Sequence, residues 1–352
     1  MNIKKYGFLA KNILKANLGR LDQPYKLTFA LTSKCNYRCQ TCNIWQKPPQ
    51  DELSASEIER LFKKAPDFSW IDLTGGEVFL RRDFVEIVEI ILANSPHLLL
   101  LHFPTNGYLT DTILAAVRKI AQWKPEKLIL TISMDGDEPV NDRIRGIPGG
   151  WRRQIETFKR LREVPGVQTV LGMTVSALNA GQFEKAFQAA KNEYPPLTYD
   201  DFHINIAHVS PHYYGNTATD LVTGSEEAMA ETIENYLRSR TFPLGPISFL
   251  EKQYLKRVGK YLQTKKTPIR CQALSSSCFL DPTGGVYPCT MYDHLLGNIR
   301  EWDYNLPALW NSPEARRLQG EIWEFNCPQC WTPCEAYQSI LGSLLRRNHG
   351  RK

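Results

Sequence analysis

The stretch KLTFALTSKCNYRCQTC, residues 26–42, joins a short apolar segment to a loop with three cysteines. Residues 26–32 are rich in Leu, Phe and Thr, which is typical of a buried β-strand. Cys35, Cys39 and Cys42 follow within eight residues. A structural zinc site usually takes four protein ligands and a disulfide takes two cysteines, so three thiols in one loop need another explanation.

Five more segments of this kind follow, and an amphipathic stretch of helical length separates each from the next. Six strand–helix units in a row predict a parallel sheet with crossover helices. Six are too few for a closed eight-fold barrel. We therefore predict an α/β fold, a partial (β/α)6 TIM-like barrel with a small cysteine-rich C-terminal domain. The further strands are expected at residues 70–75, 98–105, 127–133, 167–176 and 202–209. The helices are expected to begin near Ser56, Asp83, Thr110, Trp151, Ala180 and Ser225, the first with a capping box of Ser56 and Glu59.

The barrel pattern stops around residues 241–270, where prolines and then a basic segment interrupt it. We therefore expect four parts in the chain. These are an N-terminal amphipathic helix (1–24), the partial barrel (25–245), a linker (246–268) and the cysteine-rich domain (269–352).

The composition is that of an ordinary globular protein, with 352 residues, 42% hydrophobic residues and a net charge of +6. This mild basic excess does not indicate a nucleic-acid partner. The chain has no run of 18 apolar residues and no signal-peptide pattern, so we expect a cytoplasmic protein without a transmembrane helix. Cysteines stay reduced in that compartment, and nine of them, an odd number, favour metal or catalytic roles over disulfides.

The softness of thiolate ligands indicates which metals the three-cysteine loop can bind. Soft thiolates select zinc, copper(I) or iron–sulfur clusters. A cubane cluster has four irons, so three cysteines would hold three of them and leave the fourth open to a ligand or substrate. A zinc site with a distant fourth ligand, or a coincidental grouping, is the alternative.

The segment CNYRCQTC (35–42) has the C-x3-C-x2-C spacing of the radical S-adenosylmethionine (radical SAM) superfamily, which it resembles. The resemblance implies that its cysteines bind a 4Fe–4S cluster whose open iron is chelated by the amino and carboxylate groups of SAM. One electron would then cleave SAM to methionine and a 5′-deoxyadenosyl radical, which abstracts a hydrogen atom from the substrate. The aromatic residue common before the second or third cysteine is absent, because Arg38 and Thr41 stand there.

Later strand ends resemble SAM-binding motifs of the same superfamily. LTGGE (73–77) ends the second predicted strand, where glycines allow close backbone approach and a glutamate can accept from an amine. PTNG (104–107), ISMDG (132–136) and NDRIRG (141–146) resemble motifs of peptide-modifying members. By this resemblance the candidate SAM-binding residues are Gly75, Gly76, Glu77, Asn106, Ser133 and Arg145, with Glu77 on the amino group, Ser133 and Arg145 on the carboxylate, and Asn179 within reach of the ribose.

Six cysteines lie in the last domain, where SCFLDPTGGVYPC (277–289) predicts a β-hairpin that brings Cys278 close to Cys289. The spacing from Cys271 through Gly284 to Cys289 resembles the SPASM or twitch extension of radical SAM enzymes, including anaerobic sulfatase-maturating enzymes. The resemblance implies one or two auxiliary iron–sulfur clusters. A full SPASM domain has one more cysteine and a longer C-x2-C-x5-C segment. The candidate ligands are Cys271, Cys278, Cys289, Cys327, Cys330 and Cys334.

The sequence offers one candidate for a catalytic base. Sulfatase maturases carry an aspartate directly after the second hairpin cysteine, but Thr290 stands there, which leaves Asp293 as a candidate. The resemblance implies a peptide or protein substrate and an electron donor such as flavodoxin or ferredoxin. The alternatives are a small-molecule or lipid-modifying radical SAM oxidoreductase and a non-catalytic zinc-binding interaction protein.

Two further segments carry expectations. Residues 4–21 place apolar side chains near one helical face and lysines elsewhere, so residues 1–21 could contact an anionic membrane. We favour instead a helix that packs across the bottom of the open barrel. The segment HINIAHVSPHYYGN (203–216) is expected to line the pocket with its histidines and tyrosines.

Overall fold

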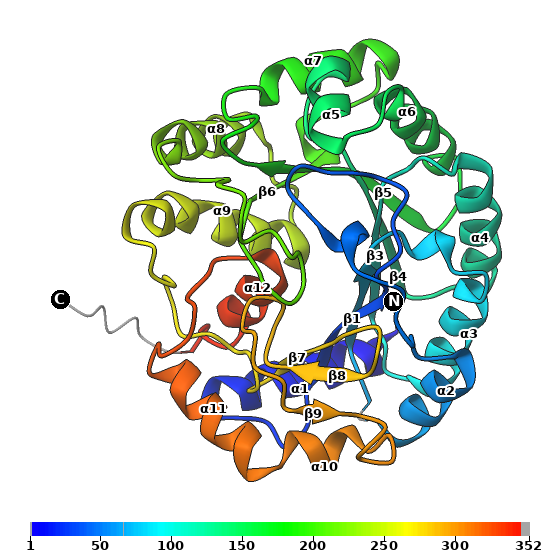
Figure 1. Cartoon of the computed structure of the whole chain (residues 1–352), viewed down its shortest axis with the longest axis vertical. Coiled ribbons are helices and arrows are strands. Elements are labelled where there is room, and N and C mark those ends of the chain that lie inside the picture. Colours follow the sequence, from blue (N-terminus) through cyan, green and yellow to red (C-terminus); the bar gives the residue numbers. More distant parts are fainter. Residues whose placement is uncertain (1, 66, 346–352) are drawn as a thin grey trace.

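The computed structural model describes residues 2–65 and 67–345. One nine-stranded sheet runs through the molecule in the order β6-β5-β4-β3-β2-β1-β7-β8-β9 (Figure 1). Strands β1 to β6 are mutually parallel, β7 is parallel to β1, and β8 and β9 are antiparallel additions. The strands are β1 (Lys26–Thr32), β2 (Trp70–Gly75), β3 (Leu100–Thr105), β4 (Lys127–Ser133), β5 (Val167–Val175), β6 (Phe202–Ile206), β7 (Ser277–Leu280), β8 (Gly285–Tyr287) and β9 (Gly297–Asn298).

Helices surround this sheet. Figure 1 shows α2, α3, α4, α6 and α7 as an outer arc around the strands, while α12 lies nearer the centre. The helices are α1 (Ile3–Leu18), α2 (Ala55–Lys64), α3 (Phe84–Asn94), α4 (Thr110–Gln122), α5 (Glu138–Arg145), α6 (Gly150–Leu161), α7 (Phe183–Glu193), α8 (Glu226–Ser239), α9 (Pro246–Thr264), α10 (Leu306–Trp310), α11 (Pro313–Trp323) and α12 (Pro333–Leu341). Three short 3-10 turns complete the set: η1 (Ile44–Gln46), η2 (Val78–Leu80) and η3 (Tyr199–Asp201).

The predicted partial barrel is confirmed. Six parallel strands alternate with helices, and the sheet stays open because β6 and β9 are its two unjoined edges. All seven residues of β1 are buried, since one face packs on the outer helices and the other faces the barrel interior. Large apolar side chains such as Phe29 and Phe103 fill the layer between strands and helices, and each stabilises the fold by about 1.5–3 kcal/mol.

The sheet register also aligns polar residues. Thr28 pairs with Asp72, and Asp72 pairs with His102, so three neighbouring strands carry a polar residue at one level. Side chains at one level of a parallel sheet point to the same face. The barrel interior is therefore polar at a level where an ordinary barrel core would be apolar.

The capping box at the start of α2 lies two residues earlier than we predicted. The N-cap is Ser54, whose Oγ accepts from Glu57 N at 3.4 Å, while Ser54 N donates to Glu57 Oε2 at 2.9 Å. Both Ser54–Glu57 and Ser56–Glu59 satisfy the spacing of the motif. The prediction of Ser56 was wrong, because the extended backbone at Ser54 ends the preceding loop there.

The cysteine-rich segment is joined to the barrel through the sheet itself. Strand β7 lies beside β1, with Leu27 opposite Cys278, and β7 and β8 form the predicted hairpin. Residues 246–268, which we expected as a linker, contain helix α9, which packs on α8 and α12.

Helix α1 packs on the chain along part of its surface. Ala16 is buried with Leu21 and Tyr25, and the Phe8 ring stacks on His97 with centroids 4.4 Å apart. Other apolar side chains of the helix, Ile3, Leu14 and Leu18, are exposed. Across the part of the chain that the structure describes, no helix combines the length and apolar character needed to span a membrane.

Candidate active site

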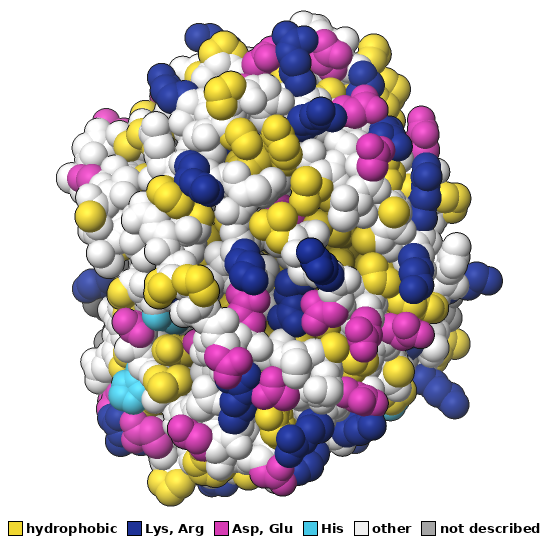
Figure 2. Space-filling model, turned by 45° about the vertical axis from the view of Figure 1, so that its right-hand side comes forward, with side chains coloured by type: hydrophobic (Ala, Val, Ile, Leu, Met, Phe, Trp, Pro, Cys, Tyr) yellow, Lys and Arg dark blue, Asp and Glu magenta, His cyan; other side chains and the backbone are white. Residues whose placement is uncertain are grey.

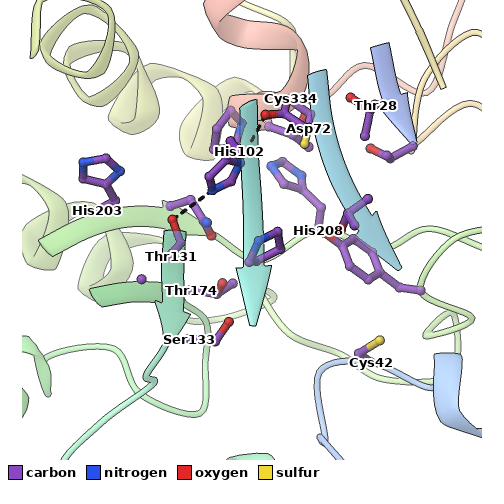
Figure 3. Close-up of a pocket in the computed structure, with 18 of the residues that line it drawn as sticks. Thr28, Cys42, Asp72, His102, Thr131, Ser133, Thr174, His203, His208 and Cys334 are labelled. Atoms are coloured by element: carbon purple, nitrogen blue, oxygen red, sulfur yellow. Dashed lines mark hydrogen bonds and ion pairs between the residues drawn. The ribbon is translucent and has the colours of Figure 1, made fainter. Parts of the chain in front are cut away.

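A cavity of about 380 Å³ occupies the barrel interior. Figure 3 shows that it is lined by inward side chains of several strands, with Cys42 and Cys334 on different sides of it. Eight of the residues predicted for the cluster and for SAM line this one cavity: Cys35, Cys39, Cys42, Gly75, Gly76, Asn106, Ser133 and Arg145.

The three-cysteine loop is held against the end of α5. Arg38 N donates to Arg145 O at 3.2 Å, and Gln40 N donates to Ile144 O at 2.7 Å. Gly146 ends α5 with a positive φ of 66°, and a Cβ there would lie 2.4 Å from Arg38 O. Glycine is therefore required for the loop to approach the helix this closely.

The three thiols lie within electrostatic reach of one another. Burial raises the pKa of Cys39 to about 12 and that of Cys42 to about 11, and the charges of neighbouring thiolates add to the effect. Burial also raises the pKa of Cys35. Three half-buried thiols that resist ionisation on their own suit a bound cation, which binds the thiolate form and releases the proton. The donor set therefore fits an iron–sulfur cluster.

The glycine pair at the end of β2 has no room for side chains. A Cβ on Gly75 would lie 2.3 Å from Thr32 O, and one on Gly76 would lie 2.1 Å from Lys34 O. Gly75 also has a φ of +123°. This packing brings the backbone at the end of β2 beside the segment that leads into Cys35, and Gly75, Gly76 and Cys35 line the cavity.

Glu77, which the resemblance predicted for the SAM amino group, makes hydrogen bonds to residues at the end of β3. Its carboxylate accepts from Thr105 Oγ1 at 2.9 Å and from Asn106 N at 2.7 Å, and it is not among the residues that line the cavity. Glu77 is buried, and burial raises its pKa to about 7 although these hydrogen bonds oppose the rise. Glu77 thus fastens the end of β3 to the end of β2, and so positions Gly76 and Asn106.

This raised pKa gives a testable pH dependence. A carboxyl whose folded pKa is about 7 instead of 4.5 contributes stability at low pH that is lost as the pH rises through 7. The glutamine side chain of Glu77→Gln is neutral at every pH, like the protonated carboxyl. We therefore expect the variant to be more stable than the wild type by up to about 3 kcal/mol near pH 8, and nearly as stable as the wild type near pH 5. Anaerobic thermal unfolding at the two pH values measures the difference. A constant difference would show that Glu77 titrates normally.

Arg145 and its neighbours form the polar wall of the cavity. Arg145 Nη2 pairs with Asp135 Oδ2 at 2.7 Å, and Arg145 Nε has no hydrogen-bond partner among the described residues. An unsatisfied buried guanidinium N–H suits a carboxylate ligand. Asn106 Nδ2 donates to Asn36 Oδ1 at 2.6 Å, which adds Asn36, a residue the sequence did not single out, to this wall.

Two sequence candidates do not line the cavity. Asn179 is buried, and its Nδ2 donates to Asp135 O at 2.9 Å, so it ties two strand ends together. Asp293 is half-exposed, and its Oδ1 lies 3.9 Å from His212 Nδ1. Thr290, three residues after the end of β8, does line the cavity.

A polar chain inside the barrel was not predicted. His102 Nδ1 lies 3.1 Å from Asp72 Oδ1, and His102 Nε2 lies 2.9 Å from Thr131 Oγ1 (Figure 3). Lys26, fully buried, pairs with Asp72 Oδ2 at 3.2 Å. Burial opposes ionisation of Asp72, but Lys26 and His102 outweigh it and lower the pKa of Asp72. The sequence signal was present, since WIDLTG and LLLLHFPT each place one ionisable residue inside an apolar strand.

The segment 203–216 lines the cavity as predicted, through His203, His208, Tyr213 and Tyr214. His212 is outside the lining, and its Nε2 donates to Cys289 O at 3.1 Å.

Four of the six C-terminal thiols lie within electrostatic reach of one another. The charges of Cys271 and Cys330 act on Cys289, and those of Cys327 and Cys330 act on Cys271. Backbone N–H groups point at two of these sulfurs, from Ala273 to Cys271 Sγ and from Met291 to Cys289 Sγ, each at 3.4 Å. Four cysteines with amide donors fit a 4Fe–4S cluster.

Cys278 and Cys334 stand apart from this group. The charges that act on Cys278 come from Glu335 and Lys26 rather than from another thiol, because β7 places it beside β1. The β7–β8 hairpin forms as expected, with Phe279 opposite Tyr287, and the closeness of Cys278 to Cys289 stays a prediction. Cys334 lines the barrel cavity, and Lys26 Nζ donates to its carbonyl oxygen at 2.5 Å. All nine cysteines are free thiols.

In residues 2–65 and 67–345, no group of three or more His, Cys, Asp and Glu side chains is arranged to hold a single metal ion. A cubane cluster places its cysteines on four separate irons, so its ligands need not converge on one point.

Comparisons with known proteins match both halves of the chain. The family model of the radical SAM superfamily matches residues 29–190, and the SPASM model, an iron–sulfur cluster-binding domain, matches residues 271–335. The antilisterial bacteriocin subtilosin biosynthesis protein AlbA of Bacillus subtilis is 24% identical over 335 residues, covering 92% of this chain and 66% of AlbA. An AdoMet-dependent heme synthase of Methanosarcina barkeri is 24% identical over 312 residues, covering 84% of each chain.

The fold also matches solved structures. Streptococcus suis SuiB bound to the precursor peptide SuiA aligns with a TM-score of 0.60 at 15% identity, covering 93% of this chain and 72% of SuiB. At this identity the likeness shows the fold alone. The chain spans about two thirds of the length of AlbA.

Proposed function

Because the chain belongs to the radical SAM superfamily and carries a SPASM iron–sulfur domain, we propose that it is an enzyme that modifies a peptide or protein. The observation that carries the proposal is the shared cavity. The three-cysteine loop, the glycine pair and the polar wall with Arg145 open into one space inside the barrel. A substrate held there would lie beside the SAM site.

Two groups of cysteines in this chain would each hold one iron–sulfur cluster. Cys35, Cys39 and Cys42 would hold the SAM-binding 4Fe–4S cluster, and Arg145 would pair with the SAM carboxylate. When bound, this cluster supplies the electron that cleaves SAM to methionine and a 5′-deoxyadenosyl radical, which abstracts a hydrogen atom from the substrate. The auxiliary cluster would be held by Cys271, Cys289, Cys327 and Cys330, while Cys278 and Cys334 would remain free.

The chain's own residues would bind and orient the ligands. The glycine pair presents backbone atoms to SAM without side chains, and Ser133 and Asn106 add hydrogen-bonding groups at the same end of the barrel. Asp72, His102 and Thr131 of the polar chain line the cavity, where they would hold a polar group of the substrate. Apolar lining residues such as Ile204 and Leu250 would exclude water.

The relatives support a peptide substrate by analogy. AlbA is described as a bacteriocin biosynthesis protein and SuiB is solved with a precursor peptide. A small molecule is the second candidate, favoured by the match to a heme synthase. Incubating the reduced enzyme with SAM and each substrate class, and measuring substrate-dependent 5′-deoxyadenosine by mass spectrometry, separates the two. No stimulation by any peptide would reject the first.

The proposal also covers the compartment, the electron donor and a possible membrane contact of the protein. We place the protein in the cytoplasm with flavodoxin or ferredoxin as the one-electron donor, because its nine free thiols suit a reducing compartment. Membrane contact through residues 1–21 would use the exposed Ile3, Leu14 and Leu18. Co-sedimentation with anionic vesicles tests it, and recovery in the supernatant would reject it.

Iron content tests the assignment of the auxiliary cluster. Wild-type protein reconstituted anaerobically should hold about eight irons, and Cys271→Ala with Cys289→Ala should lower this to about four. The matched control is Cys278→Ala, which removes a buried hairpin thiol outside the group and should leave about eight irons. Equal losses in both variants would show that Cys278 is a ligand, and no iron in any protein would reject the proposed function.

A further inference from the structure

Helix α1 crosses the end of the barrel at which the strands begin. Asn2 N donates to Glu126 Oε1 at 3.0 Å, and the Phe8 ring stacks on His97. Glu126 directly precedes β4, and His97 lies three residues before β3. The three-cysteine loop follows the last residue of β1, at the opposite ends of these parallel strands. Helix α1 and the proposed SAM site therefore lie at opposite ends of the barrel.

The outward side of α1 carries an apolar stripe. Ile3, Leu14 and Leu18 are 77%, 54% and 82% exposed. Gly7 and Ala10 are exposed as well, and the five positions follow one another at steps of three or four residues, so they share one face of the helix. Single apolar side chains on a surface are ordinary, but a continuous stripe on one helix face indicates a surface that binds a partner.

Three exposed lysines lie along one side of this stripe. They are Lys4, Lys11 and Lys15, and each directly follows a member of the stripe in the sequence. The chain has no Asp or Glu before Asp22, so no acid of the helix itself balances this positive charge. On the face of the molecule drawn in Figure 2, by contrast, basic and acidic side chains are interspersed. A helix with an apolar stripe beside a lysine row suits the interface of an anionic membrane.

The segment after α12 extends the apolar surface of α1. Asn17 Nδ2 donates to Leu341 O, and Asn17 Oδ1 accepts from Leu345 N at 2.9 Å, so this segment is fastened to the helix. Leu344 and Leu345 are 50% and 64% exposed. The sequence continues from there with RRNHGRK, which has four basic residues and no acid. We define the docking surface as the exposed large apolar residues and lysines of both segments: Ile3, Lys4, Lys11, Leu14, Lys15, Leu18, Leu344 and Leu345.

We propose that the docking surface binds the face of a membrane that contains anionic lipids. Its leucines would enter the boundary between headgroups and acyl chains, and its lysines would pair with lipid phosphates. Half of the exposed large apolar side chains in the described residues lie on this one surface, so they are gathered and not scattered. A second copy of the chain fits less well, because two such surfaces would bring like charges together.

This inference extends the membrane contact proposed for residues 1–21 to a surface built from both ends of the chain. It does not rest on the chemistry of the cavity. Because α1 and the three-cysteine loop lie at opposite ends of the barrel, a docked molecule would keep that loop on the aqueous side.

Co-sedimentation of the reconstituted holoenzyme with vesicles, without SAM or substrate, tests the inference. Vesicles of phosphatidylcholine with about one third phosphatidylglycerol are compared with vesicles of phosphatidylcholine alone. The wild type should bind the anionic vesicles at least about tenfold more tightly than the neutral ones. This binding should weaken as the salt concentration rises, because salt screens the lysines.

Leucine variants test the apolar part of the surface. Leu14→Glu with Leu18→Glu should weaken binding by about a hundredfold, because neither position can then enter the lipid. Leu344→Glu with Leu345→Glu should weaken it by about tenfold or more, which contact through α1 alone would not explain. The matched control is Leu295→Glu, which changes a leucine that is 51% exposed outside the docking surface and should bind as the wild type does.

Charge variants test the lysine row. Reversing its three lysines to glutamate should abolish the preference for anionic vesicles, since each lysine near the surface contributes to binding. The matched control reverses three exposed basic residues of α4 and α7, Arg118, Lys119 and Lys185. It changes the net charge by the same amount and should keep the preference.

Four results would overturn the inference. They are recovery of the wild type in the supernatant, equal binding to both kinds of vesicle, equal losses in a control and its matched variant, and unchanged binding after Leu344→Glu with Leu345→Glu. A wild-type dimer that Leu14→Glu with Leu18→Glu dissociates, measured by light scattering, would instead make the surface a contact between copies. If that variant does not fold, Leu18→Glu alone takes its place. The proposed function is tested separately, by 5′-deoxyadenosine formation in solution without vesicles.

Discussion

Replacing Cys35, Cys39 and Cys42 together by alanine should remove about four irons per chain and reduce 5′-deoxyadenosine formation to background. The three thiols are the soft ligands of the first loop, and they open into the cavity beside Arg145. Alanine offers no ligand, so the SAM-binding cluster cannot assemble. Iron and sulfide analysis after anaerobic reconstitution, with a SAM cleavage assay, measures both effects.

The auxiliary group supplies the control for this experiment. Its four thiols are contributed by residues after 270, so the triple variant should still hold about four irons and a brown colour. Loss of all iron would mean that the two sites assemble only together. Unchanged iron would mean that the first loop binds no cluster, and would turn the search toward the zinc alternative.

Replacing Gly76 by alanine should have the next largest effect, with loss of detectable SAM binding. The new Cβ would stand 2.1 Å from Lys34 O, a backbone atom that cannot rotate away. The end of β2 or the segment leading to Cys35 must move, and either shift displaces the backbone that lines the cavity. We expect destabilisation of several kcal/mol, in the range of overpacking at a rigid site. SAM-dependent change in the melting temperature, with iron content, measures it.

The matched control is Gly259→Ala. Gly259 lies inside α9, and a Cβ there meets nothing within 4 Å. Alanine favours the helix over glycine by about 0.5–1 kcal/mol, so this variant should be slightly stabilised and bind SAM normally. Normal SAM binding by Gly76→Ala would show that the loop after β1 can move to admit the new Cβ without disturbing the SAM site.

Strand positions could be predicted from the sequence with little error. The segments at 26–32, 70–75 and 127–133 match β1, β2 and β4 at both ends. Buried parallel strands are continuous apolar runs that end where the chain turns polar, so the signal is local. The capping box at α2 was harder, because two serine–glutamate pairs had the same spacing and only the tertiary placement of the loop chose between them.

The sequence alone also identified the candidate metal ligands. Motif spacing within one loop is a local property, and Cys35, Cys39 and Cys42 therefore stood out together. The comparisons confirm the superfamily and the cysteine-rich domain that these motifs predicted. Spacing along the chain, however, carries no information about which distant segments meet.

Only the tertiary structure decided the remaining features. It brought Cys271, Cys289, Cys327 and Cys330 within electrostatic reach of one another and placed Cys278 beside β1, because strand pairing, and not sequence distance, sets a side chain's neighbours. It joined Glu77 to Asn106 by a hydrogen bond, and it aligned Asp72 with His102 through the sheet register. Such contacts arise between segments far apart in sequence, and the chain must fold before they exist.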